Sequence, residues 1–475
     1  MNSNLTSSAN MLSFKKLDES TRCELCKCYK NGNYVLSDYS IGLKFMWREI
    51  LSPEFTVSNG CLIVKTTIQG KEYFDFPMPV NEEYNVDNAL EAIYEYCREN
   101  FIVFRLSNVP EAQLHHIISK YPCYDISFDR KYSDYVYLTS KLAEMSGRGY
   151  SGQRNHIKKF KSKYPDALFK EFAKEDIPSV KLFLKRFSSN FSCNNASATD
   201  ELRLSEEMIT HIGESCFRCG GFVLDGEIIS LCFCEKCGET LIDHIEKALY
   251  EFEGVYPATV QAFLARFGSD TKYFNREDDS GDQGLRISKL QYKPYMIAHK
   301  YVITIKNELS SVLSYPQLHS ERLSYSAITE DDIEAYNSLC LDLERNKYWG
   351  YDYRKDITDP DREYFYLDQK TDFNNRMSIC LAIRLNTKMI GEVILHSFDY
   401  RGKCEIGIRI LPEFTGQGYG REALNTIIQY ALYEIGLDAV TAKCYKENRP
   451  SSNMLSTVMR SNGNDETFEY YISTF

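Results

Sequence analysis

A glycine-rich turn between a strand and a helix constrains this sequence more than any other feature. Residues Cys404 to Leu411 alternate as a strand does, and an amphipathic helix is predicted from Arg421 to about Ile435. Between them, Thr415 to Gly420 carry glycine at three alternate positions, which lets the backbone approach a ligand closely. A helix that begins at such a loop presents unpaired N–H groups and a positive dipole end. The segment predicts a site for an anion such as pyrophosphate, with a plain turn as the alternative.

The neighbouring segments give this loop a context. Upstream, "MSICLAIRLNTKMIGEVILHSF" is a predicted hairpin around Asn386-Thr387. Downstream, "DAVTAKCY" is a predicted strand, and "NRPSSNML" follows it. This order resembles the GNAT superfamily of acetyltransferases, in particular the branch that acetylates amines of proteins and small molecules. The resemblance covers about the last third of the chain.

The resemblance implies acetyl-coenzyme A as co-substrate. The glycine loop would hold the pyrophosphate by backbone N–H groups, and the pantetheine arm would lie between two splayed strands, Cys404 to Leu411 and Ala439 to Tyr445. The implied coenzyme-binding residues are Ile410, Leu411, Thr415, Gly416, Gln417, Gly418, Tyr419, Gly420, Arg421, Asn448 and Ser451. Asn448 and Ser451 match the family's Asn-x-x-Ser/Ala segment. Thr415 departs from the Arg or Gln that is common in the family, which costs little because backbone amides do the binding.

Acetyl transfer to an amine needs a group that removes a proton from the attacking nitrogen. Glu405, on the strand before the loop, is the candidate base, and its alternative interpretation is an exposed carboxylate of a strand face. Many family members place a tyrosine general acid where this chain has Leu455. Thiolate departure would then rely on water, another hydroxyl or the leaving group itself, or else activity is low. Trp349 and Tyr351 are predicted either to line an acceptor pocket or to pack in the core.

The N-terminal two thirds carry a second resemblance. "LSDYSIGLKFMWREI", "GYSGQRNHIKKFKSKYP", "HIEKA" and "NREDDSGDQGLRISKLQYKP" are similar to the catalytic module of bacterial phosphatidylglycerol lysyltransferases, which is built as two tandem GNAT-like folds. This resemblance implies transfer of an aminoacyl group from aminoacyl-tRNA to an amine or hydroxyl acceptor. The membrane-embedded half of the lipid enzymes has no counterpart in this sequence, which argues against a lipid acceptor. The alternative is a recruiting or inactive copy of the module.

The expected fold class is α/β (α+β), with three GNAT-like units whose mixed central sheets are flanked by helices. A length of 475 residues agrees with two to four domains. The predicted ranges are a flexible arm at 1–35, two units of the lysyltransferase-like module at 36–150 and 151–305, a linker at 306–320 and the acetyltransferase domain at 321–475. Residues 124–139 are expected to form paired strands within the first unit.

Two charged groups stand out in the lysyltransferase-like module. Arg148, Arg154, Lys158, Lys159, Lys161 and Lys163 are predicted to share one helix face, which is either solvated or a phosphate-binding surface. His244, Glu246, Lys247, Asn275, Arg276, Glu277, Asp278, Asp279 and Lys289 gather beside predicted strands. The second group indicates either a polar cleft or an ion-pair network.

The cysteines raise the question of a metal. Cys216, Cys219, Cys234 and Cys237 form two C-x-x-C-G motifs that could converge on zinc at the open end of a hairpin around Asp225-Gly226. Against this, Cys232 and Cys234 also fit as alternating strand residues, and the resemblance includes no metal there. The prediction is therefore that no metal is bound, with zinc at these four cysteines as the open alternative.

Composition sets the remaining expectations. The formal net charge of −11 disfavours general binding of polyanions, although a basic patch leaves tRNA possible for the N-terminal module. No apolar run is long enough to span a membrane, and the cysteines suit a reducing cytoplasm. The expected function is acetyl transfer from acetyl-coenzyme A to a primary amine of a small molecule, peptide or protein. The rivals are aminoacyl transfer and a non-catalytic binding protein, and the acceptor and oligomeric state stay open.

Overall fold

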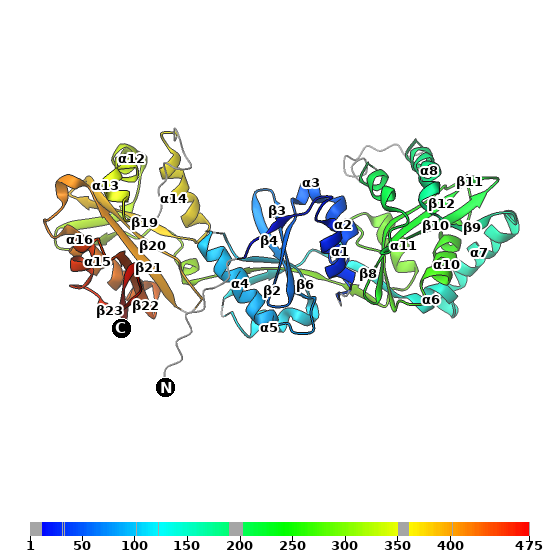
Figure 1. Ribbon diagram of the computed structural model, residues 1–475, viewed down its shortest axis with the longest axis horizontal. Helices are drawn as coiled ribbons and strands as arrows, with labels where there is room; N and C mark the ends of the chain where they lie inside the picture. The colour runs from blue at the N-terminus through cyan, green and yellow to red at the C-terminus, as the bar shows by residue number, and fades with distance from the viewer. Residues whose placement is uncertain are drawn as a thin grey trace. The chain divides into compact units, whose positions relative to one another are not determined.

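The computed structural model describes residues 12–30, 32, 34–100, 102–121, 123–189, 203–349, 361–400 and 402–474. The chain divides into two compact units. The larger comprises residues 1–96, 104–119 and 126–304, and the smaller comprises 97–103, 120–125 and 305–475. Three mixed sheets flanked by helices make up the fold (Figure 1). The predicted fold class is confirmed.

The first sheet belongs to the N-terminal part of the chain. Its strands, in spatial order, are β1 (Lys15–Lys16), β2 (Glu54–Ser58), β3 (Cys61–Ile68), β4 (Lys71–Asp75), β6 (Arg105–Pro110), β16 (Lys300–Ile305) and β7 (Tyr124–Ser127), with β5 (Met78–Pro79) paired to β3. Its helices are α1 (Arg22–Lys30), α2 (Ile41–Met46), α3 (Arg48–Leu51), α4 (Val86–Glu99) and α5 (Leu114–Ile118). Strands β4 and β6 pair in parallel, and α4 connects them.

The second sheet completes the larger unit. Its order is β11 (Glu227–Ile228), β10 (Phe217–Leu224), β12 (Ser230–Cys237), β13 (Thr240–Ala248), β14 (Tyr273–Asn275), β8 (Asp134–Leu138) and β15 (Met296–Ala298), with β9 (Leu168–Glu171) paired to β10. Its helices are α6 (Thr139–Glu144), α7 (Ser151–Lys163), α8 (Ile177–Ser189), α10 (Val255–Phe267) and α11 (Gln283–Gln291). Strands β13 and β14 are again a parallel pair joined through a helix, α10.

The third sheet forms the C-terminal unit. Its order is β17 (Leu318–His319), β18 (Leu323–Ala327), β19 (Ile379–Leu385), β20 (Lys388–His396), β21 (Lys403–Ile410), β22 (Ala439–Tyr445), β24 (Phe468–Thr474) and β23 (Arg460–Asn464). Its helices are α12 (Ile333–Leu341), α13 (Leu343–Asn346), α14 (Tyr364–Asn374), α15 (Tyr419–Gln429) and α16 (Arg449–Leu455). The parallel pair here is β21 and β22, connected through α15.

Local sequence signals explain several of these elements. Asp225 and Gly226 both have positive φ, 53° and 85°, which is the backbone of the tight hairpin that the Asp-Gly dipeptide predicts. Helix α15 buries Ala423, Leu424 and Ile427 in the core of the third sheet, at the three- and four-residue spacing of an amphipathic helix. A π-helical turn then ends this helix before Gly436.

Three predicted segments differ from the structure. The described part of the expected flexible arm is packed, because Leu17, Leu25 and Tyr29 are buried in the core of the larger unit. Residues 1–11 lie outside the described residues. The expected linker contributes β17 to the third sheet and buries Leu309 in its core. The expected pairing within residues 124–139 is wrong, since β7 belongs to the first sheet and β8 to the second.

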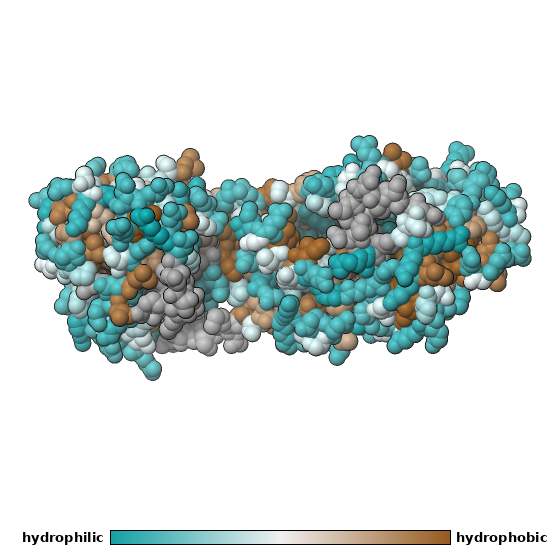
Figure 2. Space-filling view, turned by 90° about the horizontal axis from the view of Figure 1, so that it is seen from above, coloured by the Kyte–Doolittle hydropathy of each residue, from teal (hydrophilic) through white to brown (hydrophobic). Residues whose placement is uncertain are grey.

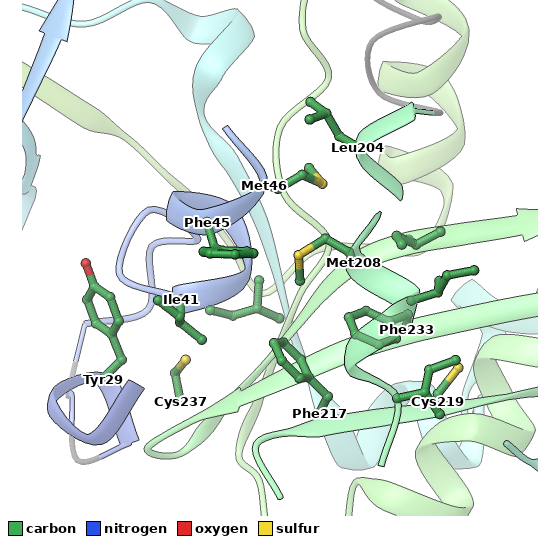
Figure 3. Packing of buried hydrophobic residues seen from close by; sticks show 14 of the residues in the cluster. Tyr29, Ile41, Phe45, Met46, Leu204, Met208, Phe217, Cys219, Phe233 and Cys237 are labelled. Carbon is green, nitrogen blue, oxygen red and sulfur yellow. The ribbon is translucent and has the colours of Figure 1, made fainter. Parts of the chain in front are cut away.

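One large apolar cluster joins the N-terminal helices to the second sheet. Figure 3 shows Tyr29 of α1 and Phe45 of α2 in the same cluster as Phe217 and Phe233, which come from β10 and β12. Phe233 is completely buried, and its ring stacks on that of Phe217 at a centroid distance of 4.9 Å. This burial holds the helices of the first sheet against the second sheet, so the larger unit has a shared core.

Hydrophilic residues cover most of the coloured surface in Figure 2, where apolar residues form small separate groups. Of the helices in the described residues, none combines the length and the apolar character that crossing a membrane requires.

Candidate active site

Strands β21 and β22 begin as neighbours and then separate. Their parallel ladder has three partner pairs, from Lys403 with Ala439 to Glu405 with Thr441. At its end the Thr441 hydroxyl donates to the carbonyl of Cys404 at 2.9 Å. Beyond it, β21 pairs only with β20 and β22 pairs only with β24 in the described ladders. The free edge of β21, residues 406–410, can therefore accept a ligand that carries amide groups.

The glycine loop lies directly after this free edge. Gly416 and Gly418 have φ of 75° and 84°, in the left-handed region, and Gly418 is the N-cap of α15. Within the described residues, the N–H groups of residues 416–421 donate to no part of the chain. A Cβ on Gly420 would lie 2.7 Å from the sulfur of Met454 on α16, so this glycine lets the two helices approach. The loop thus offers several aligned donors to an anion.

Arg322, which precedes β18, braces this loop and was not predicted from the sequence. Its Nε donates to Glu422 at 2.7 Å, and its Nη1 donates to the carbonyl of Gln417 at 3.1 Å. Its guanidinium lies 4.6 Å from the ring centroid of Tyr419. An arginine 95 residues before the loop carries no local signal of this role. It holds the loop in the conformation that exposes the amides.

Glu405 lies at the point where β21 and β22 separate. Its carboxylate is 3.4 Å from Lys443 Nζ on β22 and 4.0 Å from His396 Nε2 on β20, and its side chain is 22% exposed. Burial lowers the pKa of His396, with the charge of Glu405 acting in the opposite direction. Glu405 is therefore a partly exposed carboxylate beside a neutral imidazole at neutral pH, which suits proton transfer.

Trp349 lies on the same face of β21 as Glu405. Its ring is 4.1 Å from the guanidinium of Arg409 and packs over Gly407, where a Cβ would lie 3.0 Å from it. Arg409 is buried and bonds to Glu392 and to the Asn346 side chain. Trp349 is thus held by packing on this face, whereas Tyr351 lies outside the described residues.

The predicted Asn448 and Ser451 meet at the start of α16. The Asn448 side chain accepts the N–H of Ser451 at 3.4 Å and caps the helix. Leu455 is buried in the core, with 5% of its surface exposed. Ser452, which follows Ser451 on α16, has a hydroxyl that donates to Glu469 at 2.6 Å and lies 3.0 Å from the Tyr471 hydroxyl. This hydroxyl cluster was not predicted from the sequence.

The other two parallel pairs lack an equivalent loop. Between β13 and α10, residues 249–254 are Leu-Tyr-Glu-Phe-Glu-Gly, and a Cβ on Gly254 would lie 2.3 Å from the His156 carbonyl. Between β4 and α4, residues 76–85 include the adjacent acids Glu82 and Glu83. Acidic residues repel a phosphate. The third sheet is therefore the one whose crossover suits a pyrophosphate.

The predicted polar group of the larger unit forms a buried ion-pair network. His244 bonds to Glu277 at 2.8 Å and lies 3.2 Å from Glu235, while Arg276 makes two bonds to Glu246 at 2.8 and 3.0 Å. Arg286 pairs with the buried Asp279, Asn275 donates to Asp134, and Lys289 donates to the carbonyl of Arg276. These residues therefore form an ion-pair network, which was the alternative to a polar cleft.

Raising the pH should weaken this network through His244. Burial alone would lower the pKa of His244, but Glu235 and Glu277 raise it from 6.5 to about 10. The folded protein then holds a proton that the unfolded chain has lost, so the free energy of unfolding should fall as pH rises from 6.5 towards about 10. Urea unfolding measured across this pH range tests the prediction. In His244→Gln the slope of the free energy of unfolding against pH should be flatter. An equal slope in the variant would exclude His244 as its source.

Helix α7 carries the predicted basic face. Ile157 and Phe160 are its buried residues, and most of the basic side chains are exposed. Lys159 pairs with Glu253 at 3.1 Å, and Arg154 donates to the carbonyls of Met145 and Gly147. The helix thus presents lysines to solvent, as both interpretations of this segment require.

The four cysteines of the two C-x-x-C-G motifs do not share one face of the second sheet. Arg218 is the ladder partner of Cys234, so Cys219 points to the opposite side from Cys234. Cys219 and Cys237 lie in the apolar cluster of Figure 3, whereas Cys234 belongs to the core on the other face. The sheet therefore separates the sulfurs that a zinc site of this set requires together.

Known proteins resemble both parts of the chain. Residues 33–304 match the family described as phosphatidylglycerol lysyltransferase, C-terminal, and residues 322–458 match the acetyltransferase (GNAT) domain. The uncharacterized protein MYCGA3080 of Mycoplasmoides gallisepticum is 24% identical over 48% of this chain and 74% of its own length. The uncharacterized N-acetyltransferase YoaA of Bacillus subtilis is 25% identical over 30% of this chain and 80% of its own.

A solved structure shares the fold of a large part of the chain. It is described as a conserved protein of unknown function from Bacteroides thetaiotaomicron, is 24% identical, has a TM-score of 0.58, and covers 62% of this chain and all of its own. The first family match spans more than half of the sequence, and the second coincides with the sheet that carries the glycine loop. The chain belongs to the phosphatidylglycerol lysyltransferase C-terminal family and carries a GNAT-family acetyltransferase domain at its C-terminal end.

Proposed function

We propose that the C-terminal unit transfers an acetyl group from acetyl-coenzyme A to a primary amine of a small molecule, peptide or protein. The observation that carries this proposal is the combination of a separated strand pair and an amide-lined loop at one end of the same strand, β21. A long ligand with amides in its middle and a pyrophosphate at its end matches both features.

We assign a binding role to each part of the site. The amides of residues 416–421 bind the pyrophosphate, and Arg322 keeps their loop in place. The free edge of β21, including Ile410, aligns the pantetheine arm by backbone hydrogen bonds. The helix start at Asn448 and Ser451 lies beside the coenzyme.

In the chemical step, Glu405 accepts a proton from the attacking amine while the nitrogen bonds to the thioester carbonyl carbon. The tetrahedral intermediate then expels coenzyme A thiolate, which needs a proton or water nearby. Leu455 cannot supply that proton, so the Ser452 hydroxyl is the candidate donor on the same helix. The carboxylate of Glu405 also favours a cationic amine as acceptor, since opposite charges attract.

The test uses the full-length protein. Calorimetric titration with acetyl-coenzyme A should show binding at one site per chain, and a panel of polyamines, amino acids and peptides should identify an acceptor by release of free thiol. Binding without release for any amine favours a non-catalytic binding protein. Failure to bind acetyl-coenzyme A would overturn the proposal.

Replacing Glu405 with glutamine should lower the turnover number by about 100- to 10,000-fold, because a positioned general base contributes about that much. The dissociation constant of acetyl-coenzyme A should change little, since the pyrophosphate loop is intact. Glu434→Gln, at an exposed position of the same unit, is the matched control and should retain activity. A wild-type rate in Glu405→Gln would remove this residue from the mechanism.

We propose aminoacyl transfer from aminoacyl-tRNA by the larger unit as a second candidate. The exposed lysines of α7 favour it, because phosphate contacts drive nucleic-acid binding. Filter binding of aminoacyl-tRNA should weaken in Lys158→Glu/Lys161→Glu, and the bound aminoacyl ester should be consumed when an acceptor is present. Binding unaffected by the double variant and by salt would count against this second role.

A further inference from the structure

Two thiols and a carboxylate lie close together on one face of the second sheet, outside the proposed acetyltransferase site. Cys232 and Cys234 are both completely buried on β12, and Asp243 on β13 is 6% exposed. Cys234 is the ladder partner of Asp243, and a register shift between Phe233 and Cys234 brings Asp243 towards Cys232 as well. Among the residues that the structure describes, these three form a group able to hold a metal ion, with their ligand atoms within 4.8 Å of one another.

The distances within this group match tetrahedral coordination. Bond lengths of about 2.3 Å to sulfur and about 2.1 Å to oxygen, at tetrahedral angles, separate two sulfurs by about 3.8 Å and a sulfur and an oxygen by about 3.6 Å. The structure has 3.5 Å between the two Sγ atoms, and 3.4 and 3.6 Å from them to Asp243 Oδ1. Small side-chain rotations would accommodate an ion about 1 Å from the plane of the three atoms.

We propose that Cys232, Cys234 and Asp243 bind one thiophilic divalent cation, zinc in the cell, at a structural site that joins β12 to β13. Two thiolate ligands select zinc over magnesium or calcium, which prefer oxygen ligands. Glu246, the ladder partner of Cys232, borders the group, and Arg276 holds it by two hydrogen bonds.

The charges of the group suit a divalent ion. Only a thiolate ligates a metal, so the ion would displace the protons of both thiols. Its two positive charges would offset the two thiolates and leave the single charge of Asp243. Arg276, whose Nε lies 4.0 Å from Asp243, offsets the rest. The alternative is a metal-free cluster in which both thiols donate hydrogen bonds to Asp243.

The site would fix the bulge of β13 next to the network of His244 and Glu277. His244, which follows Asp243 directly in the sequence, is the extra residue of this bulge, because Phe233 pairs with Ile245 and Cys234 pairs with Asp243. A bound ion therefore stabilises the register of the strand that carries the network.

The test is the metal content of the full-length protein, purified without metal-chelating resin and measured by plasma mass spectrometry. We expect one zinc per chain in the wild type, and at least a tenfold lower content in Cys232→Ser and Cys234→Ser. Cys219→Ser is the matched control, because Cys219 is buried in the same sheet but on its opposite face. Equal loss of zinc in the control would overturn the assignment.

Cobalt substitution keeps the test valid if the serine variants do not fold. The wild-type protein, stripped of metal with a chelator and titrated with cobalt, should show thiolate-to-cobalt charge transfer and the visible bands of tetrahedral cobalt, saturating at one equivalent. A stripped protein that stays folded and gives no thiolate band would overturn the proposal. So would a mass spectrum showing that Cys232 and Cys234 form a disulfide in the freshly purified protein.

Discussion

Replacing Gly418 with glutamate should abolish detectable binding of acetyl-coenzyme A, with a dissociation constant at least about 100-fold higher. Gly418 has a φ of 84°, which strains any other residue, and it precedes the unpaired amides at the start of α15. A glutamate there adds a negative charge where the pyrophosphate would bind, and it lies next to Arg322. Calorimetric titration measures the effect.

Gly436→Glu is the control for backbone strain. Gly436 has a φ of 85° and an open surrounding, and it lies at the other end of the same helical segment. Both variants should lose similar stability, whereas only Gly418→Glu should lose coenzyme binding. If Gly418→Glu binds acetyl-coenzyme A as tightly as Gly436→Glu does, the loop does not hold the pyrophosphate.

Replacing Lys300 with methionine should destabilise the larger unit by about 3–5 kcal/mol. The Lys300 ammonium group is 2.7 Å from both Asp134 and Asp38 and 3.0 Å from the Ser37 hydroxyl, and its side chain is 9% exposed. Its removal leaves the buried Asp134 and the partly buried Asp38 without this cation, which costs more than the pair itself contributes. Urea unfolding monitored by circular dichroism gives the change in free energy.

Lys159→Met provides the comparison with an exposed ion pair. Lys159 contacts Glu253 at 3.1 Å, with both side chains more than half exposed, so its loss should cost no more than about 1 kcal/mol. If Lys300→Met is as mild as this control, the contacts of Lys300 with Asp134 and Asp38 contribute little to stability. Adding Asp134→Asn to Lys300→Met should recover part of the lost stability.

Local signals predicted much of the candidate site. The glycine loop, the helix after it and the hairpin at Asp225-Gly226 each depend on residues that are close in sequence, and the structure contains all three. The roles of Glu405 and of the coenzyme-binding residues remain predictions. Arg322 could not be predicted, because its contact with Gln417 joins residues 95 positions apart.

Strand pairing over long separations limited the prediction of the domains. Residues 36–150 and 151–305 look like successive units in the sequence, but β8 lies in the second sheet and β16 lies in the first. The partner of Cys234 was missed for a similar reason. Alternation places Cys232 and Cys234 on one face, whereas the approach of Asp243 depends on a register shift that no local pattern encodes.

The position of β16 also bears on how the chain emerges from a ribosome. Strand β6 pairs with β16 along one edge, and the two are separated by nearly 200 residues. During synthesis that edge stays open until residue 305 has left the exit tunnel, while the apolar side chains of the first sheet are already available. Nascent chains should therefore depend on chaperones over this interval, and fragments that stop before β16 should aggregate.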